Sequence, residues 1–282
     1  MPIYDPKVIE GHFDEYGEDE WDRLEKNPLG QVQFHIHMHY LKKYIQSGSR
    51  VLEIGPGPGR FTIELAKMGT KIGIVDISNV QLQLNETKVK EAGCEKEVLW
   101  RKKRDILNLE GIPDSSFDMV VCFGGPFSYV LEFINDAIRE VLRVTKSKGI
   151  VLASVMSCIG TYQHYLHNVF EEVIAGNVSL EEFDNLTRTG DVVGKLASKG
   201  THQCHMYRWN EFREILYNHP IEILDASATN FLSTGSTSEE ILMEMMKDPK
   251  TKEMFLKWEL DFCKEPGAID GGTHMLVVFQ KM

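Results

Sequence analysis

The stretch VLEIGPGPGRFTIELA, residues 51–66, combines residue types that a bound nucleotide-like group requires. An apolar run ends in Gly55, Gly57 and Gly59 and then feeds a helix-like pattern. Bare glycine backbone lets N–H groups approach a ligand at the positive end of the helix dipole. Glu53 adds a carboxylate inside the strand. The dinucleotide fingerprint is G-x-G-x-x-G, but here the third glycine comes one residue early, so other residues must identify the ligand.

Two more acidic residues follow the glycine turn at the ends of neighbouring strands. Asp76 ends the strand expected over residues 71–78, 21 residues after Gly55, where a carboxylate commonly holds a ribose diol. Asp105 follows the next expected strand. Taken singly, Asp105 is also explained as a helix N-cap, and Glu53 as an acid that accepts nearby N–H groups. The ordered set predicts a site for a nucleotide-like cofactor.

The elements that must position these residues alternate between short apolar strands and amphipathic helices. Strands are expected at residues 50–54, 71–78, 97–102, 117–124 and 148–157, and helices at 60–69, 79–93 and 131–145. This alternation is typical of a parallel sheet with helices on both faces. Ligands of such open sheets bind beyond the carboxyl ends of the strands, which is where the glycines and acids fall.

The alternation breaks after residue 158. Residues 159–208 are expected to be helical without a strand, and they precede a helix at 209–218, a strand at 221–231, a helical stretch at 238–263 and a final strand in GGTHMLVVFQKM. Residues 6–47 also show helical periodicity. We therefore expect an N-terminal helical cap over residues 1–48 and one domain over 49–282. Helical insertions at about 159–208 and 230–272 are expected on the face that carries the site.

Composition and charge limit the classes of partner. The 282-residue chain has a net charge of −11 and a pI of about 5.4, so it would repel phosphate backbones and no nucleic-acid partner is expected. The basic run RKKR at 101–104 is interpreted as protection of a sheet edge. No stretch reaches the roughly 20 apolar residues of a membrane span, and the acidic N-terminus is unlike a signal peptide. We therefore expect a cytoplasmic protein without a membrane partner.

The five cysteines argue against two other kinds of site. They contain no CxxC pair and are odd in number, so neither a disulfide framework nor a zinc site is indicated. His35, His37 and His39 occupy alternate positions and are interpreted as packed or solvated imidazoles. No metal is expected.

The motifs together resemble the class I S-adenosylmethionine-dependent methyltransferases. VLEIGPGPG is similar to their glycine-rich first motif, and FDMVVCFGGPFSYV to the fourth-strand motif that borders the methionine part of the cofactor. The resemblance runs from about residue 48 to 157, and the last two strands fit it as well. It implies a Rossmann-like α/β fold with a doubly wound, mostly parallel seven-stranded sheet in the order 3-2-1-4-5-7-6, the last strand antiparallel. A nicotinamide dehydrogenase is disfavoured by the early third glycine and by this final strand.

The resemblance also implies a role for each candidate residue. The cofactor would be S-adenosyl-L-methionine, with S-adenosyl-L-homocysteine as product. The glycine turn would pack against the methionine end, Asp76 would bind the ribose hydroxyls, and Asp105 would bind the adenine amino group. Glu53 and the backbone carbonyls of residues 122–124 would bind the methionine amino group. The expected cofactor-binding residues are Glu53, Gly55, Gly57, Gly59, Asp76, Ile77, Asp105, Ile106, Cys122, Phe123 and Gly124.

A small molecule is the expected methyl acceptor. Enzymes of this fold that methylate planar nitrogens often carry [N/D]-P-P-[Y/F] after strand four, whereas this chain has GGPF at residues 124–127. The N-terminal helices and the insertions offer aromatic residues for a roof over the cofactor: Trp21, Phe34, Tyr129, Tyr162, Tyr165, Phe170 and Tyr207. Two alternatives stay open. One is a methyltransferase acting on a protein or RNA nitrogen, and the other is a module that binds the cofactor without transferring its methyl group.

A general base is optional in this reaction, because thiolates and free amines need little help to attack an aligned methyl group. The candidates for such a base belong mostly to the expected roof: His164, His167, His202, His205 and Tyr129. The sequence indicates neither the identity of the acceptor nor the oligomeric state.

Overall fold

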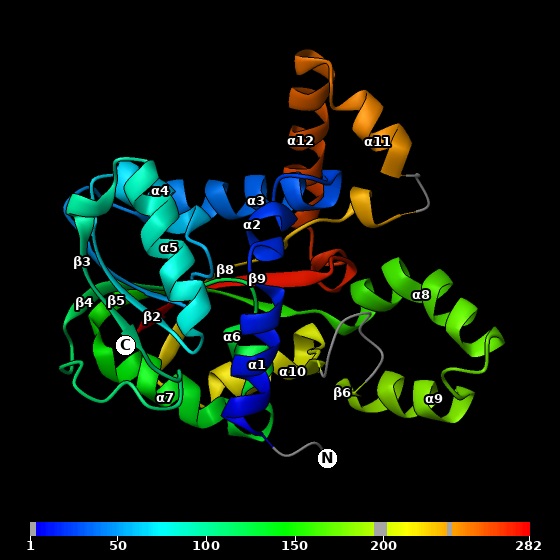
Figure 1. Cartoon of the computed structure of the whole chain (residues 1–282), viewed down its shortest axis with the longest axis horizontal. Helices are drawn as coiled ribbons and strands as arrows, with labels where there is room; N and C mark the ends of the chain where they lie inside the picture. Colours follow the sequence, from blue (N-terminus) through cyan, green and yellow to red (C-terminus); the bar gives the residue numbers. More distant parts are fainter. Residues whose placement is uncertain (1–3, 195–201, 236–238) are drawn as a thin grey trace.

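A seven-stranded sheet forms the centre of the computed structural model, which describes residues 4–194, 202–235 and 239–282 (Figure 1). The strands, in spatial order, are β3 (Val98–Lys103), β2 (Lys71–Asp76), β1 (Arg50–Ile54), β4 (Phe117–Cys122), β5 (Thr145–Met156), β9 (His274–Lys281) and β8 (Ile221–Ala228). The β1, β2, β3, β4 and β5 pairings are parallel, and β9 runs antiparallel to both β5 and β8. The expected strand order and the antiparallel last strand are confirmed.

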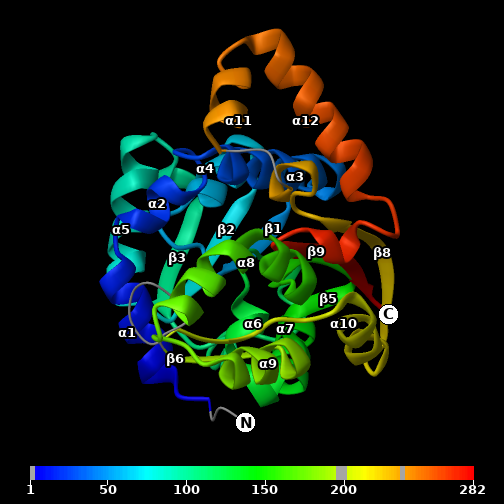
Figure 2. The ribbon, with the colours of Figure 1, turned by 90° about the vertical axis from the view of Figure 1, so that its right-hand side faces the viewer.

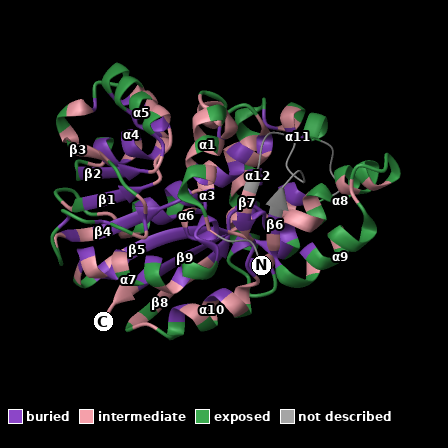
Figure 3. Ribbon diagram, turned by 60° about the horizontal axis from the view of Figure 1, so that its bottom comes forward, coloured by how far each residue is buried: buried purple, intermediate pink, exposed green. Residues whose placement is uncertain are grey.

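Helices cover both faces of this sheet. On one face lie α3 (Pro28–Tyr44), α4 (Arg60–Lys67) and α5 (Asn79–Glu91), and on the other α7 (Ile134–Val144) and α10 (Trp209–Tyr217) (Figure 1). Successive strand residues point to opposite faces, so Val51 packs into one apolar cluster and Leu52 into the other, both fully buried. Buried residues accordingly follow the strands through the middle of the molecule (Figure 3).

The N-terminal segment contributes two short helices beyond the sheet, α1 (Pro6–Tyr16) and α2 (Asp19–Arg23). Asp5 starts α1 by accepting the N–H of Lys7, with Pro6 at the first helical position, and Asn27 starts α3 in the same way. Their packing differs. α3 belongs to the core, since Ile36 and Leu41 are fully buried, whereas α1 and α2 have few buried residues.

Two helical hairpins project from the body of the molecule (Figure 1), and Figure 2 shows the molecule from the side of the first of them. The first is α8 (Cys158–Ile174) with α9 (Leu180–Thr189), and the second is α11 (Glu239–Met245) with α12 (Pro249–Cys263). The remaining short helices are α6 (Pro126–Tyr129), η1 (Glu95–Glu97), η2 (Leu131–Phe133), η3 (Leu232–Thr234) and η4 (Ile269–Gly271).

The expectation that residues 159–208 hold no strand is wrong. β6 (Asp191–Gly194) and β7 (His202–His205) form a separate two-stranded antiparallel sheet. Each strand is only four residues long, which is too short to produce a clear alternating pattern in the sequence. Their pairing is stabilised by tertiary packing, because Val192 and Cys204 are buried together with residues of α1 and α6.

His205 ties this small sheet to α10. Its Nδ1 lies 2.7 Å from Asp191 Oδ1 and its Nε2 lies 2.9 Å from Glu211 Oε1. Burial by itself would lower the pKa of His205, but the hydrogen bonds and charges of Glu211 and Asp191 outweigh it and raise the pKa above its ordinary value. The imidazolium, which donates from both nitrogens, is therefore the form that fits this position.

We predict that replacing His205 lowers stability in a pH-dependent way. A histidine whose pKa is raised by folding contributes stability that is complete below its unfolded pKa and is lost as the pH rises through the folded pKa. His205→Gln should lower the free energy of unfolding by about 2 kcal/mol at pH 5.5, and this difference from the wild type should shrink toward pH 9. Urea denaturation at both pH values measures this difference.

His219→Gln provides the control. Burial lowers the pKa of His219, whose Nε2 lies 2.9 Å from Asn135 Oδ1, so its contribution should fall on acidification instead. A stability loss in His205→Gln that is constant across the pH range would contradict the assignment.

Candidate functional site

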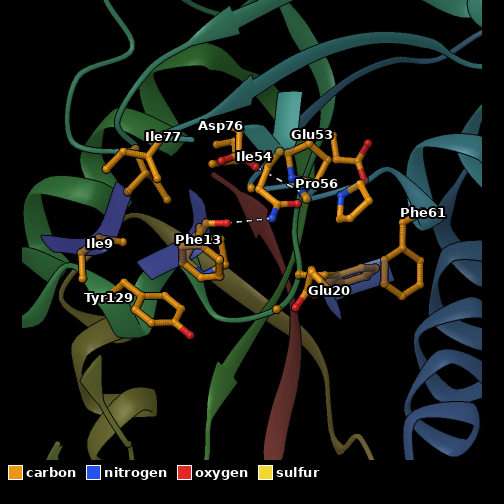
Figure 4. A pocket seen from close by; sticks show the side chains of 18 of the residues that line it. Ile9, Phe13, Glu20, Glu53, Ile54, Pro56, Phe61, Asp76, Ile77 and Tyr129 are labelled. Carbon is orange, nitrogen blue, oxygen red and sulfur yellow. Dashed lines mark hydrogen bonds between the residues drawn. The ribbon is translucent and has the colours of Figure 1, made fainter. Parts of the chain in front are cut away.

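A pocket opens where β1, β2 and β4 end, with about 990 Å³ of space between protein atoms including its mouth. The strands and the turns that leave them form one wall, and the N-terminal residues 4–24 form the opposite wall. Side chains of Asp76 and Glu53 lie on one side of this space, facing Phe13, Glu20 and Tyr129 on the other (Figure 4). The lining combines apolar side chains with a few carboxyl groups, as the binding sites of small molecules and cofactors do.

The glycine turn between β1 and α4 requires glycine for geometric reasons. Gly55, Gly57 and Gly59 all have positive φ, at 66°, 53° and 96°. A Cβ on Gly55 would lie 2.8 Å from Cγ of Pro126, and one on Gly59 would lie 2.7 Å from Nδ2 of Asn85. Gly55 and Gly57 line the pocket, whereas Gly59 precedes α4 outside the lining. The turn therefore exposes backbone to the pocket at its first two glycines and packs against α5 at the third.

Glu53 is a buried carboxyl group in the pocket wall, 2% exposed. Its Oε2 accepts a hydrogen bond of 2.7 Å from the Thr62 hydroxyl. Burial raises the pKa of Glu53 to about 7, and the neighbouring charge of Asp76 acts in the same direction. At neutral pH both the protonated and the ionised form of Glu53 are therefore populated.

Asp76 ends β2 and is buried in the same wall. Its Oδ2 accepts the N–H of Gly57 at 3.2 Å and its Oδ1 accepts the N–H of Ser78 at 2.9 Å. Burial raises the pKa of Asp76 to about 6, and these two N–H groups oppose the rise. Ile77, the next residue, supplies apolar surface to the lining.

Asp105 joins the site to the start of the chain. Its Oδ1 accepts the N–H of Leu107 at 2.9 Å, and its Oδ2 accepts the hydroxyl of Tyr4. Burial and the hydrogen bond to Asp105 raise the pKa of Tyr4, so its hydroxyl stays protonated as the donor. Asp105, Ile106 and Tyr4 all line the pocket. The part played by Tyr4 has no signal in the sequence, because it rests on a contact across 101 positions.

Residues at the end of β4 and in α6 also line the pocket. Phe123 and Gly124 line it, but Cys122 is fully buried in the core and lies outside the lining. Tyr129 lines it from α6, and burial raises the pKa of its phenol well above the ordinary value. Among the candidates for a base, Tyr129 is thus present at the pocket as a protonated phenol.

The histidine candidates whose side chains the structure describes lie elsewhere. Within the described part of the chain, the pocket lining includes no histidine. His164 and His167 lie on α8, His167 beside Glu171 at 3.2 Å, and His205 is held by its two carboxylates. His202 lies in β7, and its side chain is outside the described residues. The described residues also hold no group of three or more His, Cys, Asp or Glu side chains that could bind a metal.

The expected aromatic roof is only partly formed by the residues proposed for it. Tyr129 lines the pocket, whereas Tyr207 is a fully buried core residue and Phe34 stacks on Phe61 at 5.3 Å. Trp21 lies under the guanidinium of Arg60, 3.9 Å from ring centre to Cζ. Tyr162, Tyr165 and Phe170 lie on α8, outside the lining. The wall opposite the sheet is formed instead by residues that the sequence did not single out: Tyr4, Ile9, Phe13, Glu20, Arg23 and Leu24.

Sequence comparison links the glycine turn and its surroundings to known proteins. Residues 51–149 match the family described as "Methyltransferase domain". A putative methyltransferase of Geobacillus sp. (strain WCH70) is 29% identical over 137 residues, which cover 48% of this chain and 51% of that protein. The chain thus spans about half the length of this curated relative.

Structural comparison extends the likeness to the whole chain at the level of the fold. The [4+2]-cyclase SpnF has a TM-score of 0.59 at 15% identity, over 100% of this chain and 98% of that one. A possible histamine N-methyltransferase of Thermotoga maritima has a TM-score of 0.55 at 15% identity, over 98% and 99% of the two chains.

Among the described residues, no helix combines the length and the apolar character needed to cross a membrane.

We predict that Gly55→Ala destabilises the protein more than Gly93→Ala. Both glycines have nearly the same φ, 66° and 69°, but a Cβ meets nothing within 4 Å at Gly93 and meets Pro126 at 2.8 Å at Gly55. Gly93→Ala should lower the free energy of unfolding by about 1 kcal/mol, because alanine disfavours the left-handed backbone. Gly55→Ala should lower it by about 3 kcal/mol, because the added Cβ also crowds Pro126. Urea denaturation of the two variants measures the difference, and equal losses would show that the crowding against Pro126 is absent.

Proposed function

Because the chain carries a domain of the class I S-adenosylmethionine-dependent methyltransferases, whose cofactor is S-adenosylmethionine, we propose that it transfers the methyl group of that cofactor to a small molecule. One observation carries the proposal. A single pocket brings together the glycine turn and the carboxylates of Glu53, Asp76 and Asp105. These three acids lie in or just after β1, β2 and β3, which are neighbouring parallel strands of the sheet.

The chemistry of the pocket fits this cofactor. Asp76 offers acceptors for two ribose hydroxyls, and Asp105 offers an acceptor for the adenine amino group beside the apolar surface of Ile77 and Ile106. Glu53, whose pKa is about 7, offers a carboxylate for an ammonium group. Gly55 and Gly57, both with positive φ, line the pocket with backbone and bring Pro126 and Glu20 closer than a side chain at either position would allow.

When bound, S-adenosylmethionine supplies a methyl group on a positively charged sulfur, which an acceptor displaces in line. The residues of this chain position the reactants and exclude water. Phe13, Phe61 and Tyr129 provide apolar walls, and the buried phenol of Tyr129 stays protonated, so it acts as a hydrogen-bond donor to an acceptor rather than as a base. An acceptor that attacks as a free amine or thiolate suits a pocket whose described lining holds no histidine to act as a base.

The small size of the acceptor is supported by the cover over the site. Residues 4–24 lie across the pocket and bind its floor through the Tyr4–Asp105 hydrogen bond, which leaves less access for a polymer. The net charge of −11 also disfavours RNA as the acceptor.

All five cysteines are buried and form no disulfide, which is typical of a reducing compartment and supports a cytoplasmic location.

A second candidate function is binding of the cofactor in support of another reaction. The fold likeness to a protein described as a [4+2]-cyclase favours it, because this fold also serves chemistry other than methyl transfer. Methylation of a protein or RNA nitrogen is the other alternative. An experiment must therefore measure binding and transfer separately.

We predict that S-adenosylhomocysteine and S-adenosylmethionine bind with micromolar affinity and that Asp76→Ala weakens both by about 10- to 100-fold. Isothermal titration calorimetry measures the affinities, with NAD as a negative control. Asp118→Ala is the matched variant, because Asp118 also accepts a backbone N–H, from Arg50 at 2.9 Å, but lies outside the pocket. Equal loss in the two variants would contradict a role for Asp76 in binding.

Transfer is tested by following S-adenosylhomocysteine formation from S-adenosylmethionine with a panel of small amines, thiols and phenols. Turnover with one class identifies the acceptor nucleophile. Tight binding without turnover on small molecules, but with turnover on a protein or RNA fraction, would replace the proposed acceptor. Binding with no turnover on any of them would favour the second candidate function.

We further predict that cofactor binding releases protons through Glu53. Its pKa of about 7 means that about half of the molecules carry this proton at pH 7, and a bound ammonium group would lower the pKa and expel it. Calorimetry of S-adenosylhomocysteine binding at pH 7 in phosphate and in Tris should show a release of about half a proton per ligand. Glu53→Gln should remove most of this release. Identical proton release in the wild type and in this variant would place the ammonium group elsewhere.

A further inference from the structure

The helix α2 brings an ion pair into the pocket that the cofactor roles described above do not use. Arg23 and Glu20 both line the pocket. Nε of Arg23 donates to both oxygens of Glu20 at 3.0 Å, and Nη2 donates to Oε1 at 2.7 Å. Among the described residues, the Arg23 side chain donates no other hydrogen bond, so its Nη1 remains available to a ligand. The Arg23 side chain keeps 29% of its surface exposed.

The position of this pair is set by two glycines of the opposite wall. A Cβ on Gly57 would lie 3.2 Å from Cγ of Glu20, and one on Gly124 would lie 3.9 Å from Nη2 of Arg23. Glu20 therefore lies over the glycine turn, and Arg23 lies over the end of β4. Gly124 follows β4, whereas Asp105 follows β3, and β1 and β2 lie between these two strands in the sheet.

The other cations of the lining are engaged elsewhere. Arg60 donates to the Trp21 carbonyl at 2.6 Å, lies over the Trp21 ring and pairs with Glu25. Arg104 is exposed beside Asp105 and donates to the carbonyls of Lys103 and Glu110. Of the described cationic residues that line the pocket, Arg23 is thus the one placed between the glycine turn and β4.

We propose that Arg23 binds the α-carboxylate of the methionine half of the cofactor and that Glu20 holds the guanidinium in position for it. The inference rests on the proposed function, since it takes S-adenosylmethionine as the ligand. The methionine half carries both an ammonium and a carboxylate. Glu53 supplies an anion for the first, and a guanidinium fork matches the second. The N-terminal segment is then part of the cofactor site at both ends, through Tyr4 at Asp105 and through Arg23 at Gly124.

The test compares two ligands that differ only in the carboxylate. Calorimetry measures binding of S-adenosylhomocysteine and of its decarboxylated analogue, which keeps the adenosine and the amino group. The wild type should prefer S-adenosylhomocysteine by about 10- to 100-fold. Arg23→Gln should weaken S-adenosylhomocysteine by the same factor and leave the analogue within about twofold of its wild-type affinity, so the preference disappears.

A matched variant separates this role from a structural one. Arg139→Gln removes an arginine that pairs with Asp136 three residues earlier in a helix, as Arg23 pairs with Glu20, but outside the pocket. It should keep the wild-type preference. If Arg23→Gln weakens both ligands equally, or keeps the preference, the proposal is overturned, while the proposed methyl transfer still stands.

A measurement on the wild type covers the case in which Arg23→Gln does not fold. S-adenosylhomocysteine should slow amide hydrogen exchange of residues 18–26 by more than the decarboxylated analogue does at equal saturation. Equal protection by the two ligands overturns the role of Arg23. A wild type that binds neither ligand overturns both this role and the cofactor, whereas a carboxylate preference without methyl transfer overturns only the proposed function.

Discussion

The site depends on keeping carboxyl groups inside a pocket with largely apolar walls. An isolated buried carboxylate would become neutral, because losing water around a charge is costly. Here the N–H groups of Gly57 and Ser78 bind Asp76, and the Thr62 hydroxyl binds Glu53. These donors lie on the turns that leave β1 and β2 and on the helix after the first turn. The parallel arrangement of the two strands therefore brings each acid and its donors to the same place.

The helices that follow these two turns also hold the N-terminal wall of the pocket in place, opposite the sheet. Arg60, the first residue of α4, holds Trp21 of α2 through its carbonyl and its ring. The side-chain amide of Gln81, near the start of α5, donates to the carbonyls of Phe13 and Gly17. The helices that follow β1 and β2 thus hold the N-terminal segment over the pocket. An otherwise thinly buried segment gains its place from polar contacts with the elements that carry the acids.

Much of the fold and half of the site follow from local sequence. Buried parallel strands are continuous apolar runs, so β1 and its following helix were predictable from residues 50–69, and the acids fall at the ends of such runs. The wall formed by residues 4–24 was not, because Tyr4 and Arg23 reach the pocket through contacts with residues about 100 positions away. The short β6–β7 pair and the placement of His205 likewise depend on tertiary packing rather than on local pattern.

The base of α8 is in direct backbone contact with the segment that joins α12 to β9. A Cβ on Gly160, in the first turn of α8, would lie 1.9 Å from the carbonyl oxygen of Gly272, just before β9. The Ser157 hydroxyl bonds the Asp270 carbonyl beside it. The base of α8 and the return from α12 into the sheet are therefore interlocked without an intervening side chain. Because closely packed backbone transmits displacement, a shift of α8 at its base would also move the segment that leads into β9, the strand that runs antiparallel to both of its neighbours.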